Sequence, residues 1–187
     1  MNNQEILSDE EVAALAQKGD ENAFALLMDR YTDKLLRYGR RFLSREENIG
    51  DIVQDVFVKV YKNIKDFDAT RQFSPWIYRI AHNTFLDAIR KKSKEAIPVF
   101  DFDTVIPHPI YEDPKEQEKE TEEIRVLLEK GLEKLPAAYR EIIDLYYFEN
   151  FDYKHIVDIL HIPIGTVGIR LSRARAALKK NIPKKYE

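Results

Sequence analysis

Apolar residues recur at three- and four-residue intervals along most of the chain, which places them on one face of a helix. Charged and polar residues fill the positions between them, and no alternating run is long enough to indicate a strand. The pattern therefore predicts an all-α fold. The predicted helices cover residues 9–18, 21–44, 46–65, 75–92, 120–134, 136–148, 152–160 and 165–180.

One segment breaks the helical periodicity. Residues 96–118 contain four prolines among alternating acidic and aromatic residues, which suits neither a helix nor a core. We interpret this segment as a flexible acidic linker between two small helical domains. The predicted boundaries are an N-terminal domain over residues 1–95, the linker over 96–118 and a C-terminal domain over 119–187.

Composition narrows the class of protein. The 187 residues are 44% hydrophobic, which is enough for cores, and the absence of cysteine excludes a disulfide framework and a thiolate metal site. No apolar run approaches the roughly 18 residues needed to span a bilayer. The polar N-terminus does not resemble a signal peptide. We therefore expect a cytoplasmic protein with no membrane insertion.

The net charge of −3 hides a strong polarity along the chain. Residues 70–95 carry six basic and two acidic side chains, and residues 153–187 carry eight basic and two acidic ones. Between them, residues 96–123 carry two basic and nine acidic side chains. Two basic segments that flank an acidic one predict contact with nucleic acid at two places.

The segment FSPWIYRIAHNTFLDAIRKK, residues 73–92, begins with strong helix signals. Ser74 is a favourable N-cap and Pro75 suits the first helical position. Helical spacing gathers five side chains on one face, which we expect to pack on the rest of the domain. These are Ile77, Ile80, Ala81, Thr84 and Ala88.

A second stripe on the same helix faces away from that core face. Trp76, Asn83 and Arg90 are seven residues apart, and Arg79 and Asp87 border them. An aromatic platform, an amide and a basic edge can stack an unpaired base, read its edge and hold phosphates. The alternative is that Trp76 packs under a neighbouring loop and Arg90 is simply solvated.

The preceding segment DIVQDVFVKVYKNIKDF predicts a helix with one broad buried face and one polar face. The buried face comprises Ile52, Val53, Val56, Phe57, Val60, Tyr61 and Ile64. The polar face comprises Asp51, Gln54, Asp55, Lys59 and Lys62. By itself this polar face is typical of a solvated helix with supporting charge pairs.

The C-terminal segment FDYKHIVDILHIPIGTVGIRLSRARAALKK predicts two short helices joined by a turn. The core face of the second helix comprises Val167, Leu171, Ala174 and Leu178. The opposite arc is basic and holds Ile169, Ser172, Arg173, Ala176 and Lys180, with Thr166 and Arg170 beside it. Such a unit places its second helix in a major groove, where Arg173 could read guanine and Ile169 a thymine methyl. The alternative is a structural hairpin with a solvated basic face.

Catalytic signals are missing from the sequence. The four histidines, His82, His108, His155 and His161, show no metal-ligand spacing, and there is neither a phosphate-binding glycine loop nor a nucleophile elbow. We therefore expect no enzyme activity, no cofactor and no metal site.

These segments together resemble the sigma-70 family of bacterial transcription initiation factors, most closely its smallest members, the extracytoplasmic-function (ECF) group. DIVQDVFVKVYKNIKDFD resembles the segment that binds core RNA polymerase. FSPWIYRIAHNTFLDAIRKK resembles the segment that melts and captures the minus-10 promoter element. The region from LPAAYREIID to SRARAAL resembles the domain that reads the minus-35 element. All three occur in the family's order.

The resemblance implies roles and partners. Core polymerase contact is implied for Asp51, Gln54, Asp55 and Lys59. Contact with single-stranded minus-10 DNA is implied for Lys65, Arg71, Trp76, Arg79, Asn83, Asp87 and Arg90, with the loop of residues 65–72 holding an everted base. Contact with duplex minus-35 DNA is implied for Thr166, Ile169, Arg170, Ser172, Arg173 and Arg175. An anti-sigma factor is a common further partner in the group, although no residue names one. The acidic linker would lie in the RNA path of the polymerase.

Some positions depart from the family pattern. The family usually has a basic residue at the position of Gly168 and a small polar one at Ile169, which predicts a minus-35 preference shifted from the usual one. His161 stands where glycine or asparagine is common, and histidine tolerates left-handed backbone better than most residues. The alternative function, an autonomous helix-turn-helix regulator, explains the C-terminus but neither the Trp76 stripe nor the acidic face from Asp51 to Asp55.

Overall fold

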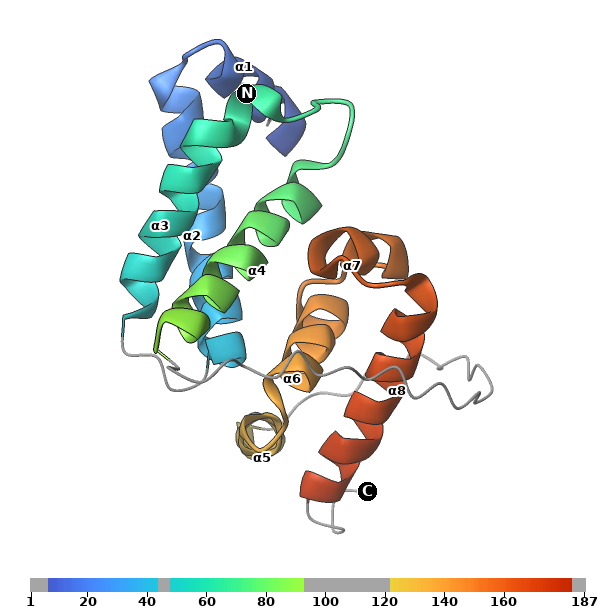
Figure 1. Ribbon diagram of the computed structural model, residues 1–187. Coiled ribbons are helices and arrows are strands. Elements are labelled where there is room, and N and C mark those ends of the chain that lie inside the picture. The colour runs from blue at the N-terminus through green and yellow to red at the C-terminus, as the bar shows by residue number, and fades with distance from the viewer. Residues whose placement is uncertain (1–6, 44–47, 93–121, 183–187) are drawn as a thin grey trace, which may run out of the picture.

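The computed structural model describes residues 7–43, 48–92 and 122–182, and every regular element in these ranges is helical (Figure 1). The prediction of an all-α chain is therefore confirmed. The predicted linker, residues 96–118, lies outside the described residues. The elements, in chain order, are α1 (Asp9–Gln17), α2 (Glu21–Leu43), α3 (Ile49–Asn63), η1 (Ile64–Asp66), α4 (Phe73–Lys92), α5 (Glu122–Glu133), α6 (Ala137–Ile143), η2 (Asp144–Phe148), α7 (Tyr153–Leu160) and α8 (Ile164–Asn181).

The first two helices are set by local side-chain caps. Ser8 accepts a hydrogen bond from the Glu11 N–H at 3.2 Å, and Glu11 accepts one from the Ser8 N–H at 2.8 Å, which forms a capping box. Gly19 then adopts a φ of 93°, a conformation that suits glycine, and reverses the chain. Asp20 accepts hydrogen bonds from the first N–H groups of α2. These caps fix the angle at which α1 crosses α2.

Helix α4 begins at Phe73, two residues before the predicted start, so Ser74 is not its N-cap. The reason is a partner distant in the chain: the Phe73 N–H donates to Oε1 of Glu10 at 2.9 Å. A carboxylate from α1 thus satisfies a helix N-terminus that sequence reasoning assigned to a local hydroxyl. Pro75 still lies in the first turn, where its missing N–H has no intrahelical acceptor.

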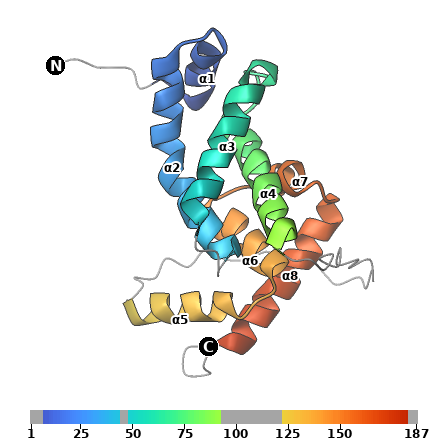
Figure 2. The same cartoon turned by 60° about the vertical axis from the view of Figure 1, so that its left-hand side comes forward.

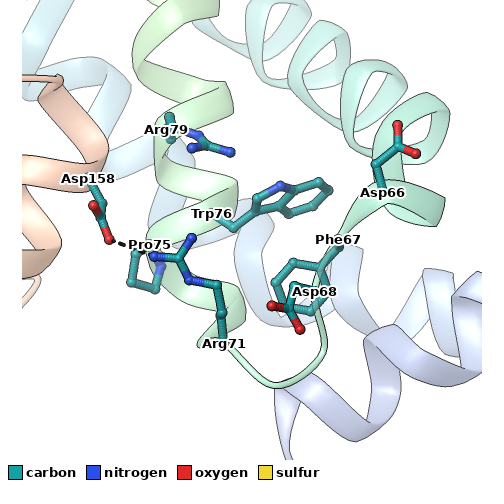
Figure 3. A pocket seen from close by; sticks show the side chains of 8 residues that line it. All are labelled: Asp66, Phe67, Asp68, Arg71, Pro75, Trp76, Arg79 and Asp158. Carbon is teal, nitrogen blue, oxygen red and sulfur yellow. Dashed lines mark hydrogen bonds and ion pairs between the residues drawn. The ribbon is translucent and has the colours of Figure 1, made fainter.

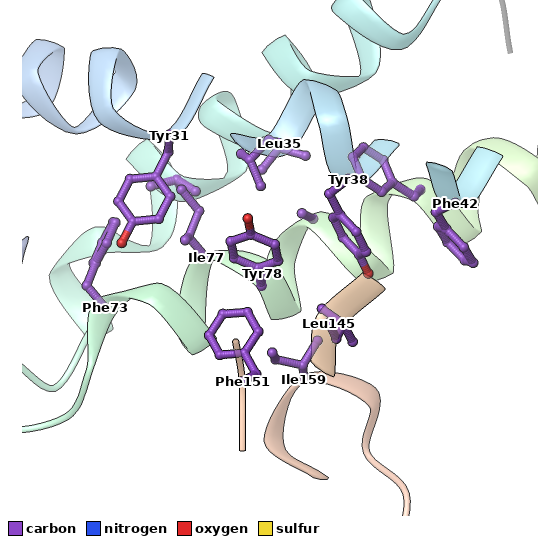
Figure 4. Close-up of a cluster of buried hydrophobic side chains, with 14 of the residues drawn as sticks. Tyr31, Leu35, Tyr38, Phe42, Phe73, Ile77, Tyr78, Leu145, Phe151 and Ile159 are labelled. Carbon is purple, nitrogen blue, oxygen red and sulfur yellow. The ribbon is translucent and has the colours of Figure 1, made fainter. Parts of the chain in front are cut away.

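The core of the N-terminal domain is rich in aromatic rings. Tyr31, Tyr38, Phe73 and Phe85 are fully buried between α2 and α4, and Figure 4 shows three of them in one cluster. The Tyr38 ring centroid lies 5.4 Å from that of Phe85. Gly39 allows this close approach, because a methyl group there would lie 3.1 Å from Cζ of Phe85 and 3.0 Å from Ile49.

The predicted buried face of α3 is confirmed except at Ile52, which is half-buried against the core, and Tyr61. Val53, Val56, Phe57 and Val60 are buried, and Ile64 is buried in η1, but Tyr61 is 60% exposed. Its ring rests edge-on against Phe24 of α2, 5.1 Å between centroids. Tyr61 lies at the margin of the apolar face, where a tyrosine can pack one edge of its ring and leave the hydroxyl in water.

In the C-terminal domain the predicted helix over 136–148 is divided. Helix α6 covers its first half, and η2 then widens into a π-turn closed by the Glu149 N–H on the Asp144 carbonyl at 3.0 Å. The wide turn comes where Asp144 and Leu145 are both buried. Asn150, with a φ of 55°, follows and leads into α7.

The two-helix unit near the C-terminus has the predicted form. Asp152 caps α7 by accepting the His155 N–H at 2.8 Å. His161 ends α7 in the left-handed region, with a φ of 52° and a ψ of 43°, so the expected role of this histidine in the turn is confirmed. Val167, Leu171 and Ala174 of α8 are fully buried, whereas Leu178, the fourth residue of the predicted core face, is half-buried.

The two domains pack directly against each other. Helix α7 lies along α4, and α6 lies against α2, as both views of the chain show (Figures 1 and 2). Leu145, Phe151 and Ile159 of the C-terminal domain meet Tyr78 and Tyr38 of the N-terminal domain in the buried cluster (Figure 4). This packing places the beginning of α4 beside the end of α7.

Candidate functional site

The outer face of α3 presents the residues predicted to bind polymerase. Asp51, Gln54 and Asp55 are all exposed on this helix, on the side opposite its buried valines. The fourth predicted residue, Lys59, is half-buried and lies 3.5 Å from Oδ2 of Asp87 on α4. The acidic face is therefore an accessible, rigid surface, and Lys59 joins it to the neighbouring helix.

A hollow of about 130 Å³ lies at the start of α4, and the structure brings three of the predicted minus-10 residues to it (Figure 3). Arg71, Trp76 and Arg79 line this hollow, which we call the Trp76 pocket. The other lining residues are Asp66, Phe67, Asp68, Pro75 and Asp158. An indole and two guanidinium groups around one opening can stack an unpaired base and hold its phosphates.

The loop that forms the floor of the Trp76 pocket is ordered by its own side chains. Oδ1 of Asp68 accepts hydrogen bonds from the Thr70 hydroxyl at 2.7 Å and from the Thr70 N–H at 3.0 Å. These two bonds hold the pKa of the Asp68 carboxyl below its usual range. The Arg71 N–H closes the turn on the Asp68 carbonyl at 2.9 Å. Arg71 is thereby placed at the rim before any ligand binds.

Trp76 both packs under a neighbouring loop and faces outward, the two arrangements that its position in the sequence allowed. Its ring is half-buried and packs against Phe67 of the loop and Phe73, with centroids 5.1 and 5.5 Å apart. The remaining surface of the indole faces the pocket (Figure 3). Packing on two rings holds the indole in one orientation, which suits a stacking platform.

The rest of the predicted stripe continues along α4 outside the pocket. Asn83 and Arg90 are exposed, and Asp87 lies between them with Oδ1 3.7 Å from Nη1 of Arg90. Lys65 is exposed in η1 and does not line the pocket. The stripe is thus continuous from the Trp76 pocket to the end of the helix.

The predicted minus-35 residues lie on α8, but they do not form one flat surface. Four of them, Thr166, Ile169, Arg170 and Arg173, line a shallow hollow with Tyr139 of α6. Ser172 is exposed beyond that hollow, and Nη1 of Arg175 lies 3.3 Å from the Tyr147 hydroxyl. The helix-turn-helix geometry therefore presents a basic helix with one apolar side chain, Ile169, among the guanidinium groups.

Gly168 of α8 lies next to Tyr153 of α7. A methyl group there would make ordinary contact with the Tyr153 ring, 3.6 Å away, so the position faces α7 rather than an outside partner. Because Gly is unfavourable within a helix, we expect Gly168→Ala to raise the free energy of unfolding by about 0.5–1 kcal/mol. Urea denaturation measures this change. Gly19→Ala, at a positive φ, is the control and should destabilise; loss of stability in Gly168→Ala would contradict the assignment.

A buried polar network between the domains is the feature that sequence reasoning missed. Oε1 of Glu141 accepts the Tyr38 hydroxyl at 2.6 Å and lies 2.5 Å from Nδ1 of His82. Beside it, Nη1 of Arg41 lies 2.7 Å from Oδ1 of Asp144. Both carboxylates are buried. Glu141 lies on α6 and Asp144 on η2. The sequence does contain a signal for this network: Glu141 and Asp144 stand three residues apart within the otherwise apolar stretch EIIDLYYF.

Neither a membrane-spanning helix nor a metal-binding cluster is found in residues 7–43, 48–92 and 122–182. No helix there is both long and apolar enough to cross a membrane. Within those same ranges, no three His, Asp or Glu side chains are grouped so that they could hold a metal ion.

Comparison with known proteins gives two family matches. Residues 27–95 match the model of sigma-70 region 2, and residues 125–178 match that of sigma-70 region 4. The chain is 35% identical over 180 residues to the ECF RNA polymerase sigma factor SigW of Bacillus subtilis, which covers 89% of this chain and 92% of that protein. It is 33% identical over 184 residues to the ECF RNA polymerase sigma-E factor of Haemophilus influenzae, covering 95% and 97% respectively.

Solved structures of similar fold agree with these matches. The structure of CnrH in complex with the cytosolic domain of CnrY superposes with a TM-score of 0.64 at 26% identity, covering 92% of this chain and 95% of that one. The sigma factor RpoE of Bartonella quintana, solved with the anti-sigma factor NepR, gives a TM-score of 0.64 at 26% identity, covering 84% and 95%. The chain belongs to the sigma-70 family of RNA polymerase sigma factors, in its ECF group.

Proposed function

We propose that this chain binds bacterial core RNA polymerase and directs promoter-specific initiation of transcription, with no catalytic activity of its own. The observation that carries the proposal is that one family framework presents three separate surfaces. They are the acidic face of α3, the Trp76 pocket on α4 and the basic helix α8. Residues 1–95 would form the region 2 domain, residues 119–187 the region 4 domain and residues 96–118 their linker.

The polymerase surface in this proposal is the acidic face of α3, formed by Asp51, Gln54 and Asp55, with Lys59 at its edge. A side chain that is exposed, charged and held on a rigid helix suits contact with a basic or polar partner helix. Because these residues support no core packing, their replacement should remove binding without unfolding the chain.

The test is binding of the purified chain to core RNA polymerase. We expect the variant Asp51→Ala/Gln54→Ala/Asp55→Ala to bind at least about tenfold more weakly, a loss of about 1.4 kcal/mol. The matched control is Asn22→Ala/Asp29→Ala/Asp33→Ala, which removes the same number of carboxylates and amides from the exposed face of α2. Equal affinity of both variants, or no binding by the folded wild type, would contradict the proposal.

Two surfaces would contact DNA in this proposal: the Trp76 pocket with the exposed stripe of α4, and helix α8. The Trp76 pocket would hold an everted base of the separated minus-10 element, since stacking on the indole offsets part of the cost of unpairing. Asn83, Asp87 and Arg90 would follow the same strand along α4. Helix α8 would enter the major groove of the minus-35 duplex, with Ile169 beside a base edge and Arg173 at guanine or phosphate.

Partners beyond polymerase and DNA follow from the relatives. CnrH and RpoE were each solved with a partner, and NepR is named an anti-sigma factor. We propose that this chain also has an anti-sigma partner and that it acts in the cytoplasm, where polymerase and promoter DNA are found. An autonomous helix-turn-helix regulator is the weaker alternative, because it leaves the region 2 match without a role.

A further inference from the structure

The C-terminal domain approaches the Trp76 pocket as part of its packing on α4. Tyr78 of α4 packs edge-on against Phe151, 5.0 Å between centroids, and its hydroxyl donates to Glu149. Tyr38 and His82 meet Glu141 one layer further along the interface. Because these contacts are buried, they fix where α7 ends relative to the start of α4.

The end of α7 brings Asp158 to the rim of the Trp76 pocket (Figure 3). Oδ2 of Asp158 lies 3.4 Å from Nη2 of Arg71, and these side chains are 52% and 67% exposed. An exposed ion pair of this kind contributes little to stability. The buried interface therefore determines the position of Asp158, and the ion pair is its consequence.

This position matters because of what Asp158 faces. Its carboxylate is an anion placed against Arg71 and close to Arg79, the two cations of the pocket. A DNA phosphate that follows a base into the pocket needs the same cations. Asp158 is the α7 residue among those that line the opening, and α7 packs on α4, so the C-terminal domain occupies that side of the pocket while the domains are packed.

We infer that, in the free chain, α7 blocks the Trp76 pocket and Asp158 takes the place of a DNA phosphate at Arg71. Single-stranded DNA and domain packing then compete for the same cations, and each weakens the other. The apparent affinity of the free chain falls in proportion to the fraction of molecules whose domains are apart. The inference rests on the proposed function for its ligand, single-stranded DNA.

The experiment uses the full chain and follows binding by the fluorescence anisotropy of a dye attached to the DNA probe, so that a variant without Trp76, the only tryptophan, can be measured in the same way. The probe is a random-sequence pool of 12-nucleotide single-stranded DNA. The test variant is Asp158→Arg, which places a like charge beside Arg71. The control is Glu133→Arg, which makes the same change of charge at another exposed position of the C-terminal domain and so accounts for general attraction of DNA.

We expect Asp158→Arg to bind the pool about fivefold or more tightly than Glu133→Arg does, and Trp76→Ala in the Asp158→Arg background to reverse the gain. Equal affinities of the two charge variants, or no binding by Asp158→Arg, would overturn the inference. Core polymerase binding by the wild type is measured in parallel. If that binding is normal while the DNA affinities are equal, the self-blocking fails and the proposed function stands.

A second readout tests domain separation without reference to affinity. The chain has no cysteine, so dyes can be attached at two introduced cysteines, Lys18→Cys and Lys154→Cys. Lys18 is exposed at the C-terminal end of α1 and Lys154 is exposed on α7, so the dyes lie on different domains. We expect Asp158→Arg, and saturating single-stranded DNA on the wild type, to increase the mean dye separation. An unchanged separation in both cases would show that DNA enters with the domains packed, which overturns the inference.

Discussion

Replacing Phe85 by alanine is expected to lower the free energy of unfolding by about 3–5 kcal/mol. The Phe85 ring is fully buried and lies 5.4 Å from the Tyr38 ring and 6.4 Å from the Phe42 ring, centroid to centroid. Removing it takes away the buried apolar area and leaves a cavity between α2 and α4. Urea denaturation followed by circular dichroism measures the loss.

The size of this effect depends on how far the neighbours can collapse into the cavity. Phe85 fills the space that Gly39 leaves open on α2, and Gly39 has no side chain to move into the gap. Tyr38 is held in place by its hydrogen bond to Glu141 and cannot easily follow. We therefore expect a loss near the upper part of the range.

The control for this prediction is Val58→Ala on α3. Val58 is 50% exposed and should change the free energy of unfolding by no more than about 0.5 kcal/mol. If Phe85→Ala also fell within about 1 kcal/mol of the wild type, the ring would not be a central part of the core.

Helix positions could be predicted from the sequence because local signals and periodicity agree along most of the chain. Ser8 with Glu11, Asp20, Asp152 and His161 act as caps or turn residues through contacts with their close neighbours in sequence. Where the cap comes from a distant segment, as with Glu10 at the start of α4, the predicted boundary was wrong.

The second buried face of α4 could not be predicted in the same way. Of the five residues that the sequence placed in the core, Ile77, Ala81 and Thr84 are buried, whereas Ile80 and Ala88 are half-buried. It did not indicate that Tyr78 and His82 are buried too, because their partners Glu149 and Glu141 lie 71 and 59 residues further along the chain, in the other domain. Periodicity shows that a face is apolar or mixed, but not which distant element covers it.

In the candidate site, too, local features could be predicted from the sequence, whereas a contact between distant segments could not. Trp76 and Arg79 were predicted to contact an unpaired base from their residue types and helical positions, and Arg71 from the resemblance to the family. It could not place Asp158 beside them, since no local pattern joins positions that are 87 residues apart. The chemistry of each surface was thus predictable, and the contact between the surfaces was not.

The stability of the chain is expected to fall as the pH rises from about 4 to about 7, and Asp144→Asn is expected to remove most of this fall. The Asp144 side chain is only 1% exposed. Burial raises the pKa of its carboxyl to about 7. The Arg41 guanidinium opposes this increase, while Glu149 and Glu141 add to it. Oδ2 of Asp144 has no hydrogen-bond partner within the described ranges.

The sign follows from the difference between the two states. In the unfolded chain Asp144 has an ordinary pKa near 4, so it loses its proton well before the folded form does. The neutral carboxyl stabilises the fold fully below about pH 4, and this contribution is lost as the pH rises through about 7. Each pKa unit of difference corresponds to about 1.4 kcal/mol, so the total approaches about 4 kcal/mol.

Urea denaturation at pH 5, 6, 7 and 8 checks this prediction. Asn has the shape of the neutral carboxyl and cannot ionise, so Asp144→Asn should be more stable than the wild type at pH 8, and this difference should narrow steadily as the pH is lowered to 5. Asp29→Asn, at an exposed position of α2, is the control and should follow the wild-type profile. Parallel profiles for all three proteins would show that Asp144 does not hold its proton in the folded chain.

The carboxyl proton of Asp144 also makes the packing of the two domains depend on pH. Asp144 belongs to the C-terminal domain, whereas Arg41, its partner at 2.7 Å, belongs to α2 of the N-terminal domain. Separation of the domains exposes the carboxyl to water, returns its pKa toward the ordinary value and releases the proton near neutral pH. Opening is therefore favoured as the pH rises. The dye pair at Lys18→Cys and Lys154→Cys should report a greater separation at pH 8 than at pH 6, and Asp144→Asn should make that separation independent of pH.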